Sequence, residues 1–340
     1  MKHIVKLGLA AAVALAGATG VANAQATLEK VKQRGTVACG VAPGLPGFSN
    51  PDDKGNWTGL DVDFCRAMAA AIFGDPKKVT FKPLTAKERF TALQSGEVDL
   101  LSRNTTWTMG RDSAMGLTFA GVMFYDGQGF MAKKSLKITS AKQLNGASIC
   151  VATGTTTELN LADYFRANKM TYKTVVFEKD TELLAAYEAG RCDAWTTDSS
   201  GLYAELLKLK KPADHVVLPE IISKEPLGPV VRQGDFQFFT LTKWVYYALL
   251  TAEELGVTQA NVDEMKKSTN PDIKRLVGTE GEFGKPIGLT QDWAARIIKG
   301  VGNYGEIYER NVGVKSPLKI ARGINNLWTK GGLQYAPPIR

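Results

Sequence analysis

The hydrophobic pattern of residues 35–101 switches repeatedly between the period of a strand and that of a helix. Residues 61–73 place the apolar side chains Val62, Cys65, Met68 and Ile72 at helical spacing. Short runs rich in β-branched residues, bounded by glycine or turn residues, predict strands. The expected elements are a strand at 35–41, a helix at 61–73, a strand at 79–81, a helix at 86–94 and a strand at 98–101. This alternation is typical of a mostly parallel sheet with helices on both faces.

A second block with the same alternation follows an extended connector at 122–132. Its expected elements are strands at 147–152, 175–177, 192–196 and 216–218, with helices at 157–165, 181–189 and 199–208. Another extended connector, at 229–232, then leads the chain out of the block. The two blocks predict two α/β lobes, and the two crossings predict a hinge between them.

The remainder of the chain is predicted to be largely helical, and it contains no strand pattern of its own. Expected helices cover 242–255, 290–301, 307–310 and 320–328. A helical tail without strands should pack on an existing lobe. We therefore expect residues 25–131 and 233–340 to form lobe 1 and residues 132–232 to form lobe 2.

The first 24 residues have the pattern of a secretory signal peptide. Lys2 and Lys6 precede a short apolar run, and Ala22-Asn23-Ala24 matches a cleavage site, which places cleavage after Ala24. No later apolar run approaches the roughly 20 residues that a membrane-spanning helix needs. The sequence therefore predicts an exported, soluble protein.

The formal net charge is +8, and the basic residues are spread along the chain without runs longer than pairs such as Lys210-Lys211. We interpret this charge as favouring solubility and a general attraction for anions, and not as a nucleic-acid site.

All four cysteines, Cys39, Cys65, Cys150 and Cys192, follow the leader. An even number in an exported chain suggests two disulfides, for which three pairings exist, or alternatively four free buried thiols. We favour the local pairing Cys39–Cys65 and Cys150–Cys192. A zinc site is not expected, because no C-x-x-C occurs and His215 is the only histidine after the leader.

The stretch 99–112, DLLSRNTTWTMGRD, carries the first candidate binding site. A strand ends here in a polar loop with Asn104 and Thr106, and Arg111 follows. An arginine can pair two-for-two with a carboxylate, and ligands of parallel sheets bind at the carboxyl ends of strands. The alternative is a surface loop with a solvated arginine.

The second block adds two further candidate groups. The turn Gly154-Thr155-Thr156-Thr157 opens a helix, whose free N–H groups suit an anion, although the threonines could equally cap the helix. Asp198 follows a strand and could bind a cation or cap the next helix. Arg111, Thr156 and Asp198 together describe an anion socket and a cation socket, which a zwitterionic amino acid would fit.

Several long motifs support one family. They are GLDVDFCRAMA, ERFTALQSGEVDLL, Asn104-x-Thr106 followed by Arg111, GTTTE and GRCDAWTTD. With them the chain resembles the polar amino-acid-binding proteins of bacterial ABC transporters, from about Thr27 to Arg340. Within this family the chain most resembles the general L-amino-acid-binding subfamily, on the segments VGNYGEIYERNVG, RGINNLWTKGGLQYAPP and KWVYYALLTAEELG. The resemblance implies the two-lobe type II periplasmic binding fold.

The resemblance also implies roles for individual residues. Arg111 would clamp the ligand's α-carboxylate and Asp198 would pair with its α-ammonium, while Thr106 would contact both groups. The backbone carbonyl of Asn104 would take the ammonium, and the Thr155-Thr156 turn would complete the carboxylate socket through the Thr156 N–H. Arg89 matches an arginine that reaches the distal carboxylate in binders of acidic amino acids. Relatives carry an aromatic lid where this chain has Leu45, with Phe48 or Trp57 as substitutes.

The expected function is therefore capture of polar and acidic L-amino acids such as glutamate, glutamine, aspartate and asparagine in the periplasm. Delivery would be to an inner-membrane ABC permease, by a monomer that uses no cofactor or metal and binds no nucleic acid. The alternative is a secreted enzyme on the same fold, such as a dehydratase. An enzyme needs a general acid or base in the cleft, and His215 lies beyond the last predicted helix of lobe 2. Glu158 remains as the candidate base, although a glutamate in a first helical turn is more often a cap. A third hypothesis is that the chain is the receptor domain of a sensor protein.

Overall fold

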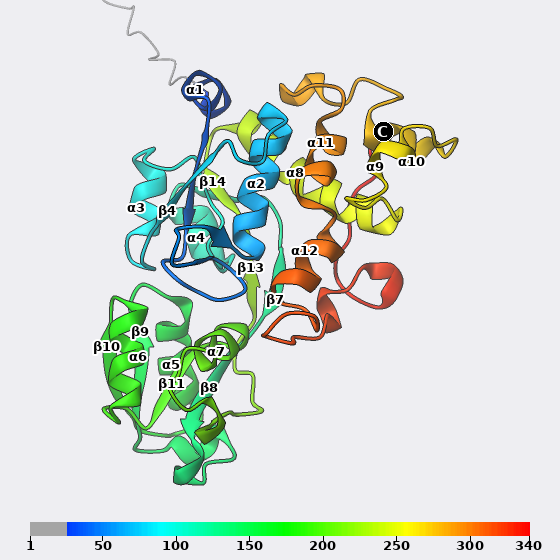
Figure 1. The fold of residues 1–340 in the computed structure, drawn as a ribbon. Helices are drawn as coiled ribbons and strands as arrows, with labels where there is room; N and C mark the ends of the chain where they lie inside the picture. The colour runs from blue at the N-terminus through cyan, green and yellow to red at the C-terminus, as the bar shows by residue number, and fades with distance from the viewer. Residues whose placement is uncertain (1–25) are drawn as a thin grey trace, which may run out of the picture.

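The two blocks fold as two separate five-stranded sheets, one in each lobe (Figure 1). The structure is a computed structural model, and it describes residues 26–340. The predicted signal peptide therefore lies outside the described residues. No helix among residues 26–340 is both long and apolar enough to cross a membrane.

The sheet of the first lobe has the order β4-β1-β5-β14-β6. β1 pairs in parallel with β4 and β5, whereas β14 runs antiparallel to β5 and β6. The elements of this part of the chain are α1 (Thr27–Arg34), β1 (Val37–Val41), β2 (Asn50–Pro51), β3 (Trp57–Thr58), α2 (Leu60–Phe73), β4 (Val79–Pro83), α3 (Arg89–Gln94), β5 (Leu100–Leu101), α4 (Met109–Ala114) and β6 (Leu117–Phe119).

The sheet of the second lobe repeats this plan with the order β10-β9-β11-β8-β12. β9 pairs in parallel with β10 and β11, and β8 is the one reversed strand. Its elements are β8 (Gln128–Lys133), β9 (Ser148–Ala152), α5 (Thr156–Ala167), β10 (Lys173–Phe177), α6 (Asp180–Glu188), β11 (Ala194–Asp198), α7 (Ser199–Leu206) and β12 (His215–Val217).

Two short strands, β7 (Phe124–Asp126) and β13 (Glu225–Leu227), pair antiparallel and connect the lobes. β8 follows β7 and is the reversed strand of the lobe-2 sheet, and β14 follows β13 and is the reversed strand of the lobe-1 sheet. The expected lobe boundaries therefore move: the one at 131/132 falls inside β8, and the one at 232/233 leaves β14 (Val230–Arg232) in the wrong lobe. An extended apolar run does not reveal from sequence which sheet it will join, which explains both shifts.

Helices cover both faces of each sheet, as the alternation predicts. In lobe 1, α2 and the later helices bury one face, while Phe90 and Leu93 of α3 bury the other with Leu101. In lobe 2, α5 covers one face through Leu161 and Phe165, and α6 and α7 cover the other. Because the helices cover the faces, only loops cover the carboxyl ends of the parallel strands in both lobes.

The C-terminal helices pack beside the first lobe, in yellow to red at the right of Figure 1. They are α8 (Phe236–Glu254), α9 (Val262–Met265), α10 (Pro271–Val277), α11 (Trp293–Val301) and α12 (Tyr304–Asn311). This confirms the expected helical extension on lobe 1. The expected helix at 320–328 is wrong, because this part has only short 3-10 turns, at Gly323–Asn325 and from Trp328 to Lys330. Gly323 has a positive φ of 46°, which a continuing helix would not permit.

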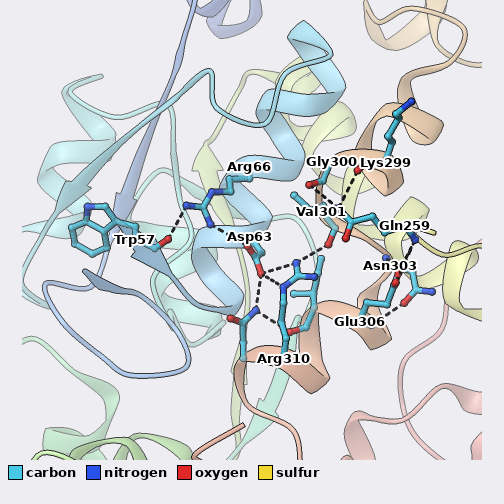
Figure 2. Close-up of polar contacts among 12 residues, drawn as sticks. Trp57, Asp63, Arg66, Gln259, Lys299, Gly300, Val301, Asn303, Glu306 and Arg310 are labelled. Carbon is cyan, nitrogen blue, oxygen red and sulfur yellow. Dashed lines mark hydrogen bonds and ion pairs between the residues drawn. The ribbon is translucent and has the colours of Figure 1, made fainter. Parts of the chain in front are cut away.

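Polar contacts fix the extension to α2, as Figure 2 shows around Asp63. The Asp63 carboxylate accepts hydrogen bonds from Arg310 Nε at 2.9 Å and Asn311 Nδ2 at 2.7 Å, both on α12. Arg66 Nη1 of the same helix as Asp63 adds a contact at 3.3 Å. Apolar side chains of α2, α8, α11 and α12 continue into one core. The extension is therefore an integral part of the first lobe.

The extension also contacts the hinge strand β7. The Asn325 side-chain oxygen accepts from Tyr125 N at 2.7 Å, and its amide nitrogen donates to Tyr125 O at 3.1 Å. Tyr304 and Gln334 donate to the carbonyls of Met123 and Val122. Asn325 and Gln334 are both buried. The hinge is thus held from one side by residues near the end of the chain.

Both predicted disulfides are present. Cys39 of β1 is bonded to Cys65 of α2, and Cys150 of β9 is bonded to Cys192 before β11. Each bridge ties elements of one lobe, so neither restrains the movement of one lobe against the other.

Candidate functional site

The hinge strand β13 lies between β7 and the loop that follows β5. On one side Glu225 pairs with Asp126 of β7. On the other side Thr106 forms a bridge with Leu227, and Trp107 N donates to Pro226 O at 2.8 Å. The polar loop predicted from sequence is therefore placed at the junction of the two lobes.

Glu225 occupies the centre of this junction, with only 1 % of its surface exposed. Its Oε2 accepts from the Thr106 hydroxyl at 2.7 Å and from the Thr156 hydroxyl at 2.8 Å. Its Oε1 accepts from Asn160 Nδ2 at 2.7 Å and from the Ser223 hydroxyl at 2.6 Å. Thr106 belongs to lobe 1, whereas Thr156 and Asn160 belong to lobe 2. The carboxylate therefore joins the two lobes by direct hydrogen bonds.

Arg111 lies on the short helix α4, which begins with Thr108 accepting a bond from Arg111 N at 3.3 Å. Its guanidinium is buried, donates to Thr106 O at 2.9 Å and lies over the Phe90 ring at 5.0 Å. Burial lowers the pKa of Arg111 to about 10, opposed by the charges of Glu225 and Asp198. The arginine stays charged at neutral pH and is therefore able to bind an anion.

Arg89, at the start of α3, is buried but poorly partnered. Its hydrogen bonds to Thr105 Oγ1 and to Gly154 O of the other lobe are long, at 3.4 and 3.5 Å. Within residues 26–340 its Nε has no hydrogen-bond partner. Burial and the neighbouring Arg103 and Arg111 lower its pKa well below the usual value. A buried guanidinium in this condition gains most from an added anion.

Asp198 ends β11 in lobe 2 and is buried. It is the residue before α7, yet its carboxylate makes no capping hydrogen bond to the helix among the described residues. Burial, followed by the charges of Asp126 and Glu225, raises its pKa well above the usual value. The positive charges of Arg89 and Arg111 oppose this rise. The charges of the two lobes therefore act on one another at this site.

Asp126 adds another carboxylate from β7. It accepts from Gly127 N at 2.8 Å and from the Ser200 hydroxyl. Burial raises its pKa to about 6. Asp198 of lobe 2 and the hinge residues Asp126 and Glu225 together bring three carboxylates to the junction, and a bound cation would relieve their mutual repulsion.

Asn104 is held in place by a residue that the sequence analysis did not single out. Asp61, in the first turn of α2, accepts from Asn104 N at 2.9 Å and from the Ser102 hydroxyl at 3.0 Å. Asn104 has a positive φ of 35°, an uncommon conformation that Asp61 stabilises through this bond. Burial raises the pKa of Asp61 to about 6. The signal for this role was an aspartate at the beginning of a buried helix.

The GTTTE turn serves first as a helix start. Thr155 caps α5 by accepting from Glu158 N at 3.2 Å, and its hydroxyl donates to Ala152 O at 2.7 Å. Glu158 in turn accepts from Gly154 N at 3.2 Å. These contacts match the capping interpretation for Thr155 and Glu158. Thr156 differs, because its side chain turns to Glu225 and lies 3.3 Å from the Thr106 hydroxyl.

The predicted residues from the two lobes therefore meet, with Thr106, Arg89 and Arg111 on one side and Thr156 and Asp198 on the other. Further contacts cross between the lobes, including Lys87 to Glu178 at 3.3 Å and Lys208 Nζ to Gly44 O at 3.1 Å. The lobes are in direct contact at the site, so the structure represents a closed arrangement.

The aromatic residues of the site differ from those considered in the sequence. Phe48, one candidate lid, is buried in the core against Phe124, and Trp57 packs on Phe81. Phe90 instead has two guanidiniums close to its ring, with Arg89 at 4.8 Å from the ring centre and Arg111 at 5.0 Å. Sequence reasoning missed Phe90 because its spacing indicates only the apolar face of a helix, where it also contributes to the core.

This arrangement combines buried positive groups on lobe 1 with buried carboxylates on lobe 2 and on the hinge strands. A ligand with a carboxylate and an ammonium would contact both lobes at once. It would also balance charges that are costly to bury alone.

The sequence profile of the bacterial extracellular solute-binding proteins, family 3, matches residues 37–276. The chain is 62% identical over 339 residues to the general L-amino acid-binding periplasmic protein AapJ of Rhizobium johnstonii, covering 99% of each chain. It is 55% identical over 329 residues to the glutamate/glutamine/aspartate/asparagine-binding protein BztA of Rhodobacter capsulatus, covering 96% of this chain and 97% of BztA.

A solved structure has the same fold over nearly the whole chain. It is an ABC transporter/periplasmic binding protein from Brucella ovis with glutathione bound. The two share 64% sequence identity and a TM-score of 0.91, over 93% of this chain and 99% of the other. The glutamine-binding protein of Geobacillus stearothermophilus is 35% identical over only 205 residues, or 59% of this chain.

Proposed function

Because this chain belongs to the bacterial extracellular solute-binding proteins, family 3, we propose that it captures L-amino acids and delivers them to an ABC transporter permease. The observation that carries the proposal is the placement of Arg111 and Asp198, which are buried, oppositely charged and borne by different lobes. A zwitterionic ligand would pair with both. Only the closed form presents both groups to one molecule, so ligand binding favours closure.

We assign the α-carboxylate to Arg111, aided by the backbone N–H at Thr156, and the α-ammonium to Asp198. The carbonyl of Asn104 and the Thr106 hydroxyl would face the ammonium as well. Thr155 supports the Thr156 N–H indirectly, because the Thr155 side chain caps the start of α5. Asp61 is a positioning residue, because its bond to Asn104 N fixes the direction of the loop.

The ligands we propose are polar and acidic amino acids, with glutamate, glutamine, aspartate and asparagine favoured. Support comes from Arg89, whose unpaired Nε and long hydrogen bonds suit a distal carboxylate or amide oxygen. BztA is named for these four ligands. The glutathione of the Brucella ovis structure contains a glutamyl residue with free α-amino and α-carboxylate groups. The same two sockets would therefore suit it.

We further propose that the protein is exported to the periplasm, is cleaved after Ala24 and acts as a monomer. The residues of the leader and the periplasmic location of AapJ support export.

An enzyme on this fold is the less favoured alternative. His215 lies on β12 and is hydrogen-bonded to the Tyr187 hydroxyl at 2.9 Å. Glu158 is occupied with the start of α5. Within residues 26–340 neither side chain is hydrogen-bonded to the charged groups around Glu225. The relatives are also named as binding proteins.

The proposed function is tested by screening the twenty L-amino acids for thermal stabilisation, after unfolding and refolding to remove any carried-over ligand. We expect acidic amino acids and their amides to raise the melting temperature by mass action. Small-angle scattering should show a decrease in the radius of gyration with the same ligands. If no amino acid stabilises the refolded protein, the proposal is wrong.

Replacing Arg89 by alanine should change selectivity. We expect a loss of roughly 10- to 100-fold in affinity for glutamate and aspartate, the usual range for a hydrogen bond to a charged group, and a small change for alanine. Titration calorimetry measures both. Arg166→Ala is the matched control, because Arg166 is an exposed arginine on α5. An equal loss for all ligands would show that Arg89 acts only by packing against Phe90.

A further inference from the structure

The hydroxyl groups of Thr106 and Thr156 are not free to adopt either hydrogen-bonding role. A hydroxyl carries a single proton, which it can donate once. Both protons are directed to Glu225 Oε2, at 2.7 Å from Thr106 and 2.8 Å from Thr156. The two oxygens therefore offer only lone pairs to any other group. At this point the site accepts hydrogen bonds and does not donate them.

Glu225 is itself held firmly in this role. Asn160 and Ser223 donate to its Oε1, so both carboxylate oxygens have two donors. All four donors are neutral, and the side chain is 1 % exposed. Its position on the hinge strand β13, paired with β7, fixes the backbone that carries it. The direction of the two hydroxyl protons is thus imposed by a buried, fully bonded carboxylate.

We propose that Glu225 is a positioning residue that makes Thr106 and Thr156 acceptors and thereby selects ligands with a protonated amine. The inference rests on the proposed amino-acid ligand and adds the residue that sets its orientation. The ammonium lies against the two hydroxyls and Asp198. The carboxylate is left to Arg111 and cannot exchange places with the ammonium, because the threonine hydroxyls have no proton to give it.

The test compares L-glutamate with glutarate, which has the same two carboxylates and no amine. Glu225→Met removes the acceptor at similar length and frees both hydroxyl protons. We expect its preference for L-glutamate over glutarate, measured by titration calorimetry, to fall by roughly 10- to 100-fold, the range for a hydrogen bond to a charged group. Glu225→Gln is the matched control. Its amide oxygen can still accept both threonine protons, so the preference should stay within a few-fold of wild type.

Two results would overturn the inference. Equal losses of both ligands in Glu225→Met would show a purely structural role. An equal fall in preference for Glu225→Gln and Glu225→Met would show that the charge matters and the proton direction does not. Wild type that binds neither ligand nor any other amino acid would instead contradict the proposed function itself.

A second variant keeps the test decisive if Glu225→Met does not fold. Thr106→Val keeps the branched side chain and removes the hydroxyl, and with it both the donor and the acceptor. An accepting hydroxyl predicts a loss of affinity for L-glutamate and an unchanged affinity for glutarate. If Thr106→Val weakens both ligands alike, the hydroxyl donates to a carboxylate and the inference is wrong.

Discussion

Arg111→Lys is expected to abolish most amino-acid binding, with a loss of roughly 2–5 kcal/mol, the cost of breaking a buried charged pair. A lysine ammonium is a point charge and cannot reproduce the two-point fork of a guanidinium. It would also have to bond Thr106 O and occupy the space over Phe90 that Arg111 fills. Titration calorimetry measures the affinity. Small-angle scattering should show that the ligand decreases the radius of gyration of the wild type and leaves that of the variant unchanged.

Asp198→Asn is the companion variant on the other lobe, and it should weaken α-amino ligands by a similar amount. Removing this buried, poorly solvated charge should not unfold the protein, because the Asp198 carboxylate accepts no capping bond from α7 within the described chain. The melting temperature without ligand should therefore be kept. If Arg111→Lys and Asp198→Asn both bind amino acids like wild type, the ligand lies elsewhere.

Loss of either disulfide is expected to cost about 3–4 kcal/mol of stability in the chain-entropy model. The bridges enclose sequence separations of 26 and 42 residues. The measurement is denaturant unfolding of Cys39→Ala/Cys65→Ala and of Cys150→Ala/Cys192→Ala. Each pair should lower the free energy of unfolding while leaving ligand affinity nearly unchanged, because each bridge lies within one lobe.

Wild type treated with a reductant that opens both bridges provides the control, and it should be less stable than either double variant. Peptide mapping without reduction should recover the two bridged peptides separately. A change below about 1 kcal/mol in both double variants would contradict the entropic account.

The alternating blocks made most of the fold predictable from sequence. Residues 61–73 and 147–152 needed only local spacing, and both became the expected elements within a residue or two. The hinge was harder, because the choice of sheet for 128–133 depends on pairing with β11 and β12. The prediction of a helix at 320–328 was wrong because the apolar residues of this segment do not share one buried face. Leu327 is buried, whereas Ile324 is exposed.

The charged residues of the site were predictable where they follow the carboxyl end of a strand, as Asp198 does directly and Arg111 does after a polar loop. The short helix α4 that carries Arg111 was not expected. Glu225 was missed because it stands alone in an extended connector, SKEPLG, that carries no motif of its own. Its role arises only when β13 pairs with β7 and brings Thr106 and Thr156, which are far away in sequence, to the same carboxylate. Such long-range convergence leaves no local pattern.

The contact between Asn325 and Tyr125 has a consequence for the order of folding. The two residues are separated by 200 positions, and Gln334 reaches Val122 across 212. Contacts of such separation close large loops and therefore form late, after the local strand–helix units. We therefore expect the contacts of residues 325–334 with the hinge to form after the two sheets. Both lobes can acquire their sheets from nearer parts of the chain, whereas β7 gains these partners only when residues 325–334 are in place.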